Sequence, residues 1–200
     1  MAAKKVFWMD VETTGLFASK HAIVQFAYMI EVNGKIVAKK VIFASPEKKE
    51  ISDKALEITG FTRKELLSWP SQHDLYSSLK KTLNKYIDPY DKEDKFFIGG
   101  YNVHFDVEFF RKLFKDHDDD YFGSYFHFST IDPSRVGAFL EWADYAPAHS
   151  IDYKLKTLCQ TWGYDLEEAH DALADVEATR GLAIRMVDVL KAPVVAAGGG

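Results

Sequence analysis

The sequence has a single cysteine, Cys159, among its 200 residues. One thiol cannot form an intrachain disulfide, and zinc sites built on pairs of thiolates are excluded for the same reason. Any metal that the protein binds must therefore be held by carboxylates or histidines.

Long apolar segments are also missing. No apolar run reaches the roughly 18 residues that a membrane-spanning helix needs. The first ten residues, MAAKKVFWMD, contain neither the apolar stretch nor the small-residue cleavage site of a secretory signal. We therefore expect a cytoplasmic protein that has no contact with membranes.

The sequence has no excess of positive charge, because its formal net charge is −5. Proteins that bind long duplexes usually carry a basic face that displaces counterions. The charge therefore disfavours tight duplex binding, whereas a small substrate contact or binding bridged by metal stays compatible with it.

Hydrophobic residues make up 47% of the chain, which suffices for a substantial core. No internal repeat or interdomain linker interrupts the sequence. We expect one domain over residues 1–191, followed by a disordered Ala/Pro/Gly tail over residues 192–200.

The first quarter of the sequence predicts three antiparallel strands. Residues 6–11 form an almost continuous apolar run, which is typical of a strand buried on both faces. Residues 22–32 and 36–43 are rich in β-branched and aromatic side chains, and Asn33-Gly34 between them is a strong hairpin signal.

Helices and further strands follow. Helical patterns cover 53–58, a segment after Thr62, 73–87, a segment around 109–113, and the chain from about 154, with a final helix over 172–190. Strands are expected at 96–101 and 126–131. This alternation predicts an α/β fold, a mixed sheet with helices on its faces.

Asp10 and Glu12 lie two residues apart on the first predicted strand, so both carboxylates project from the same face. Burying two like charges costs several kcal/mol per ion unless a cation or hydrogen bonds compensate. A divalent metal explains the pair. The alternative places Asp10 at the strand end and Glu12 in solvent within the Thr13-Thr14-Gly15 turn.

The sequence allows more than one role for three further polar residues. Asp106 lies near a helix start, where a carboxylate also satisfies free backbone N–H groups. Asp175 sits among small and apolar neighbours in the final helix. His170 and Asp175 are about 140° apart on an ideal helix and converge only if His170 lies in the preceding loop; Asp171 is a plausible helix N-cap.

In order and spacing, three segments together resemble the motifs of the DEDDh family of 3′-to-5′ exonucleases: Asp10-x-Glu12-Thr13-Thr14-Gly15, Asn102-x-x-Phe105-Asp106 and His170-x-Ala172-x-x-Asp175. Proofreading subunits of bacterial replicative polymerases, ribonuclease T and oligoribonuclease are members of this family. The resemblance covers about residues 5–190. It implies a ribonuclease-H-like fold with a five-stranded mixed sheet, its first three strands antiparallel, flanked by helices.

The resemblance also implies the chemistry. Asp10, Glu12, Asp106 and Asp175 would hold two Mg²⁺ or Mn²⁺ ions, which prefer oxygen ligands. His170 would act as general base toward water, and nucleoside 5′-monophosphates would be released. Candidate nucleic-acid contacts are Thr13, Thr14, Gly15, Leu16, Phe17 and Asn102.

The expected substrates are 3′ ends of single-stranded DNA or RNA, with DNA favoured because the Thr-Thr-Gly turn resembles the proofreading and ribonuclease T branches. Some family members are dimers, so a homodimer is compatible with the resemblance. Only about ten residues follow the last predicted helix, so we expect no segment that tethers the chain to a polymerase. The alternative function is an inert exonuclease-fold module that binds nucleic acid or a polymerase.

Overall fold

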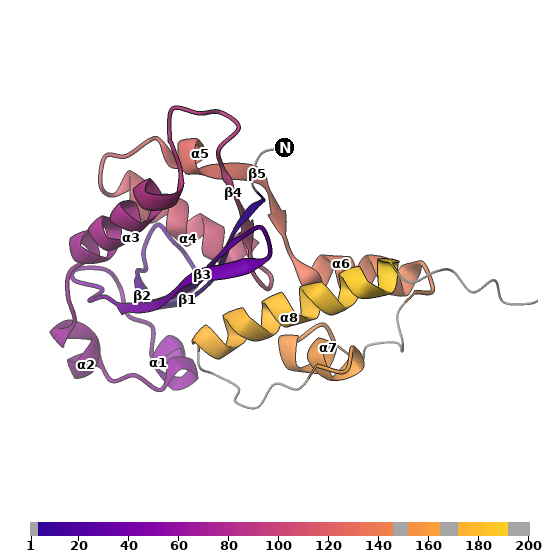
Figure 1. The fold of residues 1–200 in the computed structure, drawn as a ribbon. Coiled ribbons are helices and arrows are strands. Elements are labelled where there is room, and N and C mark those ends of the chain that lie inside the picture. The colour runs from indigo at the N-terminus through magenta and orange to yellow at the C-terminus, as the bar shows by residue number, and fades with distance from the viewer. Residues whose placement is uncertain (1–3, 146–151, 165–171, 192–200) are drawn as a thin grey trace, which may run out of the picture.

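The computed structural model describes residues 4–145, 152–164 and 172–191. Figure 1 shows the elements along the chain, which are β1 (Lys5–Thr13), β2 (Ile23–Val32), β3 (Lys35–Phe43), α1 (Asp53–Thr59), α2 (Arg63–Ser68), α3 (Gln72–Tyr86), β4 (Phe96–Gly99), α4 (His104–Lys115), α5 (Phe122–Tyr125), β5 (Phe126–Ile131), α6 (Pro133–Trp142), α7 (Leu155–Thr161) and α8 (Ala172–Lys191). The expected tail, residues 192–200, lies outside the described residues.

The strands form one five-stranded sheet in the order β3-β2-β1-β4-β5. β1, β2 and β3 pair antiparallel, whereas β4 runs parallel to β1 and β5 runs parallel to β4. The expected mixed sheet with three antiparallel strands first is therefore confirmed, and β1 is its central strand.

The hairpin between β2 and β3 turns at Asn33 and Gly34, which have φ angles of 51° and 81°. Positive φ at both central residues is what a two-residue hairpin turn with the twist of the sheet requires, and Asn-Gly tolerates it best. The local sequence therefore sets the pairing of β2 with β3 next to the turn.

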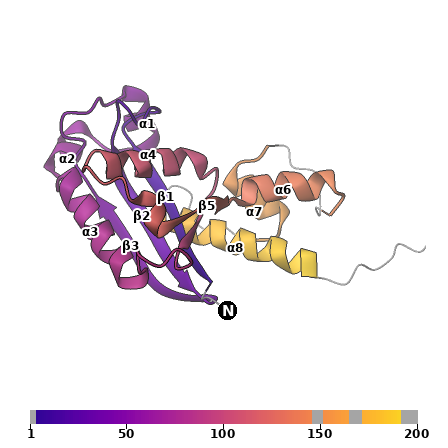
Figure 2. The same cartoon turned by 90° about the horizontal axis from the view of Figure 1, so that it is seen from above.

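Helices cover both faces of the sheet (Figure 2). On one face, Phe7 of β1 contacts Phe26, Phe96 and Phe110 in an aromatic core that α3 and α4 cover. On the other face, Trp8, Ala27 and Met29 belong to a smaller cluster with Ala172 and Val176 of α8. Successive residues of β1 thus point into different layers, as strand geometry dictates.

The helices α6, α7 and α8 form a lobe beside the sheet with an apolar cluster of its own, including Leu140, Leu158 and Leu182 (Figures 1 and 2). Helix α6 was not among the helices predicted from the sequence, although Asp132 is its N-cap and Pro133 occupies its first turn. That pair is a helix-start signal. Within the described residues, no helix has the length and apolar character needed to cross a membrane.

Candidate active site

Strand β1 carries Asp10 and Glu12 into the middle of the fold. The strand continues to Thr13, and Asp10 and Glu12 lie opposite Ala27 and Gln25 of β2. Neither residue is therefore in the turn, which was the alternative placement. Both are partly buried. Because alternate residues of a strand point to the same side, they project from the same face of the sheet as Trp8, which packs in a cluster with residues of α8.

Asp106 reaches the same strand from the opposite helix layer. It lies in the first turn of α4 and is 4% exposed. Its Oδ1 accepts a hydrogen bond of 3.0 Å from the backbone N–H of Val11, between Asp10 and Glu12 in the chain. This bond ties the start of α4 to β1 in addition to any stabilisation of the helix start.

Asp175 lies in the first turn of α8, one residue before the buried Val176 that packs in the cluster beneath the sheet. α8 thereby brings a fourth carboxylate from a distant part of the sequence. His170 lies outside the described residues.

The four carboxylates interact electrostatically. Burial, followed by the charges of Asp106, Glu12 and Asp175, holds the pKa of Asp10 well above its usual range. Burial also raises the pKa of Asp106 to about 7, although hydrogen bonds from backbone N–H groups oppose that rise. Four acids from β1, α4 and α8 therefore share one electrostatic environment.

Among the described residues, no group of three or more His, Cys, Asp and Glu side chains forms a ready-made metal site. The donor set still suits a hard divalent cation, because all four members are carboxylates. A cation would offset the repulsion and desolvation that raise the pKa of Asp10 and Asp106. The residues present therefore fit such ions.

A largely apolar pocket of about 440 Å³ adjoins Glu12. Its lining includes Glu12, Thr13, Gly15, Leu16, Ile58 and Phe105. Leu16 is 73% exposed and Ile58 is 63% exposed, so both present apolar surface to solvent. The pocket can hold a flat ring next to the carboxylates.

The contribution of α1 to this pocket is not apparent from the sequence. Ile58, Ala55 and Thr59 belong to a helix that has no buried residue. The sequence carried no signal for this role, because the exposure of Ile58 and the position of α1 beside β1 arise only from packing between distant segments. Phe105 was within a recognised motif but was not assigned a contact.

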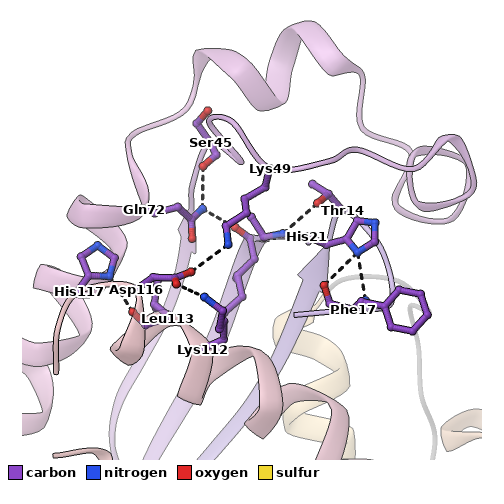
Figure 3. Close-up of polar contacts among 12 residues, drawn as sticks. Thr14, Phe17, His21, Ser45, Lys49, Gln72, Lys112, Leu113, Asp116 and His117 are labelled. Carbon is purple, nitrogen blue, oxygen red and sulfur yellow. Dashed lines mark hydrogen bonds and ion pairs between the residues drawn. The ribbon is translucent and has the colours of Figure 1, made fainter. Parts of the chain in front are cut away.

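Hydrogen bonds of Thr14 fix the turn after β1 to neighbouring segments (Figure 3). The hydroxyl of Thr14 donates to the carbonyl of Glu50 at 2.6 Å and accepts from the N–H of Ala22 at 3.0 Å. Thr14 is 1% exposed, so its side chain supports the turn and does not line the pocket. Phe17 is 61% exposed, outside the pocket lining, and its backbone contacts the His21 ring.

Gly15 packs directly against the ring of His21. A Cβ atom at this position would lie 2.3 Å from the ring of His21, which real contacts do not allow. Glycine lets the backbone approach the ring, and the next residue, Leu16, then points outward. The turn thus presents an exposed apolar side chain, Leu16, to solvent.

Asn102 is placed by a buried aspartate at the end of β5. Its φ angle is 49°, and its N–H donates to Asp132 Oδ1 at 3.2 Å. The same oxygen accepts from the N–H and hydroxyl of Ser134 at the start of α6. Asp132 therefore joins the starts of α4 and α6, and Asn102 lies outside the lining of the apolar pocket.

The sequence resembles those of known nucleic-acid enzymes. The family model RNase_T, described as exonuclease, matches residues 7–182. The PolC-type DNA polymerase III of Bacillus subtilis (strain 168) is 27% identical over 178 residues, which cover 89% of this chain and 11% of that polymerase. The corresponding polymerase of Halalkalibacterium halodurans is 30% identical over 187 residues, with 89% and 11% covered.

Solved structures share the fold. Escherichia coli exonuclease I in complex with a dA16 oligonucleotide has a TM-score of 0.73 at 22% identity, covering 92% of this chain and 41% of that one. The zinc-ion-bound form of an E. coli exonuclease I complex with single-stranded DNA has a TM-score of 0.77 at 21% identity, covering 94% and 41%. The sheet and helices therefore match the ribonuclease-H-like fold of exonuclease I. The chain spans only about a tenth of its curated relatives.

Proposed function

Because this chain belongs to the RNase_T exonuclease family, we propose that it is a metal-dependent 3′-to-5′ exonuclease acting on single-stranded nucleic acid, with DNA preferred to RNA. The observation that carries the proposal is the cluster of Asp10, Glu12, Asp106 and Asp175 around the end of β1, beside an apolar pocket. We assign the activity to residues 1–191 as one domain.

In this proposal the four carboxylates hold two Mg²⁺ or Mn²⁺ ions. Such a pair supplies activation of water and stabilisation of charge on the attacking and leaving oxygens when it is bound. Asp10 and Glu12 act from one strand, so their spacing is fixed by β1. Asp106 is held by its hydrogen bond with Val11, which fixes the third carboxylate relative to that strand.

The reaction is a hydrolysis. The oxygen of a water molecule forms a bond to the terminal phosphorus, while the bond from phosphorus to the 3′ oxygen of the preceding nucleotide breaks. His170 takes the proton from that water, a role suited to an imidazole with an ordinary pKa near 6.5. The leaving 3′ oxygen takes up a proton from solvent, so the products are a nucleoside 5′-monophosphate and a strand one nucleotide shorter with a free 3′ hydroxyl.

The pocket beside Glu12 would receive the terminal nucleotide. Leu16, Ile58 and Phe105 offer apolar faces for a base, and Thr13 and Gly15 line the pocket beside Glu12. Stacking of this kind tolerates any base, which suits stepwise removal of nucleotides. The similarity to exonuclease I bound to single-stranded DNA supports DNA as the substrate.

The test is digestion of matched 3′- and 5′-labelled DNA and RNA oligonucleotides with Mg²⁺, with Mn²⁺ or with EDTA. We expect a ladder that shortens from the 3′ end, faster for DNA, and only with metal. Asp10→Asn should reduce turnover by at least about a hundredfold, because one ligand charge is lost from the reacting centre.

Asp120→Asn is the matched control, since Asp120 is an exposed aspartate in the segment between α4 and α5. It should retain wild-type turnover. Activity that survives EDTA would contradict the metal requirement. Intact oligonucleotides in every lane, from protein with a normal melting transition, would instead favour an inert exonuclease-fold module.

A further inference from the structure

Two large aromatic side chains on α6 are exposed to solvent and touch each other. Phe139 is 60% exposed and Trp142 is 80% exposed, and their ring centroids are 5.9 Å apart. The opposite side of the helix carries Gly137 and Leu140, which are buried in the lobe with Leu158 and Met186. The two rings are therefore not needed to hold α6 in place.

A cation shares this face of the helix. Arg135, Phe139 and Trp142 are spaced i, i+4 and i+7, so they line one stripe about 10 Å long, here called the α6 stripe. The side chain of Arg135 is 73% exposed, with its Nε 3.7 Å from Asp132 Oδ2. Ala138 is the other exposed residue of α6, so the exposed side chains of this helix include no acid.

The stripe begins next to the candidate active site. Asp132, the N-cap of α6, accepts the N–H of Asn102, which lies two residues before α4 and four before Asp106. Moving along α6 from this point leads first to Arg135 and then to the two rings. A strand whose 3′ end lies at the carboxylates can therefore continue along α6.

The size of the aromatic surface indicates its occupant. Phenylalanine and tryptophan each offer about 150–250 Å² when fully exposed, so the two rings present roughly 300 Å². A stable protein interface needs about 800 Å² on each partner. Two rings with a flanking guanidinium match instead one or two stacked bases and a phosphate.

We propose that the α6 stripe binds single-stranded nucleic acid on the 5′ side of the nucleotide being removed, with bases stacked on Phe139 and Trp142 and a phosphate at Arg135. The proposal rests on the proposed exonuclease function. The stripe would increase affinity for longer strands and leave the chemical step unchanged.

The first experiment compares KM and kcat for a DNA trimer and a 16-mer. Phe139→Ala combined with Trp142→Ala should raise KM for the 16-mer at least about tenfold, because each stacked base contributes about 1–3 kcal/mol. The trimer should be unaffected, and kcat should change less than twofold for both. Phe139→Tyr with Trp142→Phe should restore the 16-mer KM, and Tyr90→Ala, which removes a 93% exposed ring elsewhere, is the matched control.

The second experiment needs no catalysis. In EDTA, a dT16 oligonucleotide should quench the tryptophan emission of the wild type, and Trp142→Phe should abolish most of this change. The reason is that Trp8 and Trp162 are 4% and 7% exposed, and Trp69 packs against two phenylalanine rings beside α2.

This emission readout stays informative if the exonuclease proposal fails. Equal 16-mer KM values for wild type and double variant, with normal cleavage, would overturn the stripe alone. A wild-type dimer that the double variant converts to monomer would assign the stripe to self-association and would also overturn it.

Discussion

Asp106 is a buried acid whose charge the folded chain disfavours. Its pKa rises from the ordinary 3.8 to about 7, chiefly through burial. The folded protein therefore binds this proton more tightly than the unfolded chain does. The resulting stabilisation is complete below about pH 4 and is lost as the pH rises through 7.

Asp106→Asn should therefore stabilise the metal-free protein at pH 8 while it abolishes activity. The amide keeps an oxygen that can accept the N–H of Val11 and carries no charge. We expect a gain on the order of 2–4 kcal/mol in the free energy of unfolding at pH 8 and little change at pH 4. Urea unfolding at both pH values measures this; a loss of stability at pH 8 would show that the charge is tolerated.

At the scale of elements, the position of α8 along β1 determines how closely Asp175 approaches Asp10. A polar clamp holds the helix five residues beyond Asp175. Glu31 Oε2 of β2 accepts from Arg180 Nε at 2.7 Å and from Trp8 Nε1 at 3.0 Å. The side chains of Arg180 and Glu31 are 22% and 16% exposed, so the pair is only partly screened by water.

Arg180→Ala should lower the free energy of unfolding by about 2 kcal/mol, because it leaves Glu31 partly buried without its cation. It should also raise the Mn²⁺ concentration for half-maximal activity several-fold, because α8 then carries Asp175 less rigidly. Lys39→Ala is the matched control, since it breaks the more exposed pair of Lys39 with Glu177 on the same helix. An unchanged Mn²⁺ requirement in Arg180→Ala would limit the clamp to stability.

For the whole molecule, the net charge of −5 comes together with a local cluster of acids from three elements. Folding brings these like charges together, and their repulsion is greatest when all are ionised. A divalent cation that binds only the folded chain stabilises it by mass action.

Millimolar Mn²⁺ should therefore raise the melting temperature by several degrees at pH 8 and by much less at pH 5, where protons compete for Asp10 and Asp106. Differential scanning calorimetry at matched ionic strength measures both shifts. Asp10→Asn should remove most of the pH 8 shift. Equal shifts at the two pH values would indicate binding elsewhere on the acidic surface.

Local sequence determined much of this protein. The Asn33-Gly34 turn and the β-branched runs specified the first three strands, because hairpin geometry depends on a few adjacent residues. The two-residue spacing of Asp10 and Glu12 placed both carboxylates on one face, because side chains alternate along any strand. Motif spacing then led to the exonuclease family, which the match over residues 7–182 confirmed.

Only the tertiary structure decided what surrounds those carboxylates. Packing between segments far apart in the chain places Ile58 in the pocket and brings the N–H of Asn102 to Asp132. The same packing leaves Phe139 and Trp142 exposed. Sequence periodicity reports which side of an element is apolar, but not which element covers it. The raised pKa values of Asp10 and Asp106 also arise only in the folded protein, because burial and neighbouring charges act on them only once β1, α4 and α8 have come together.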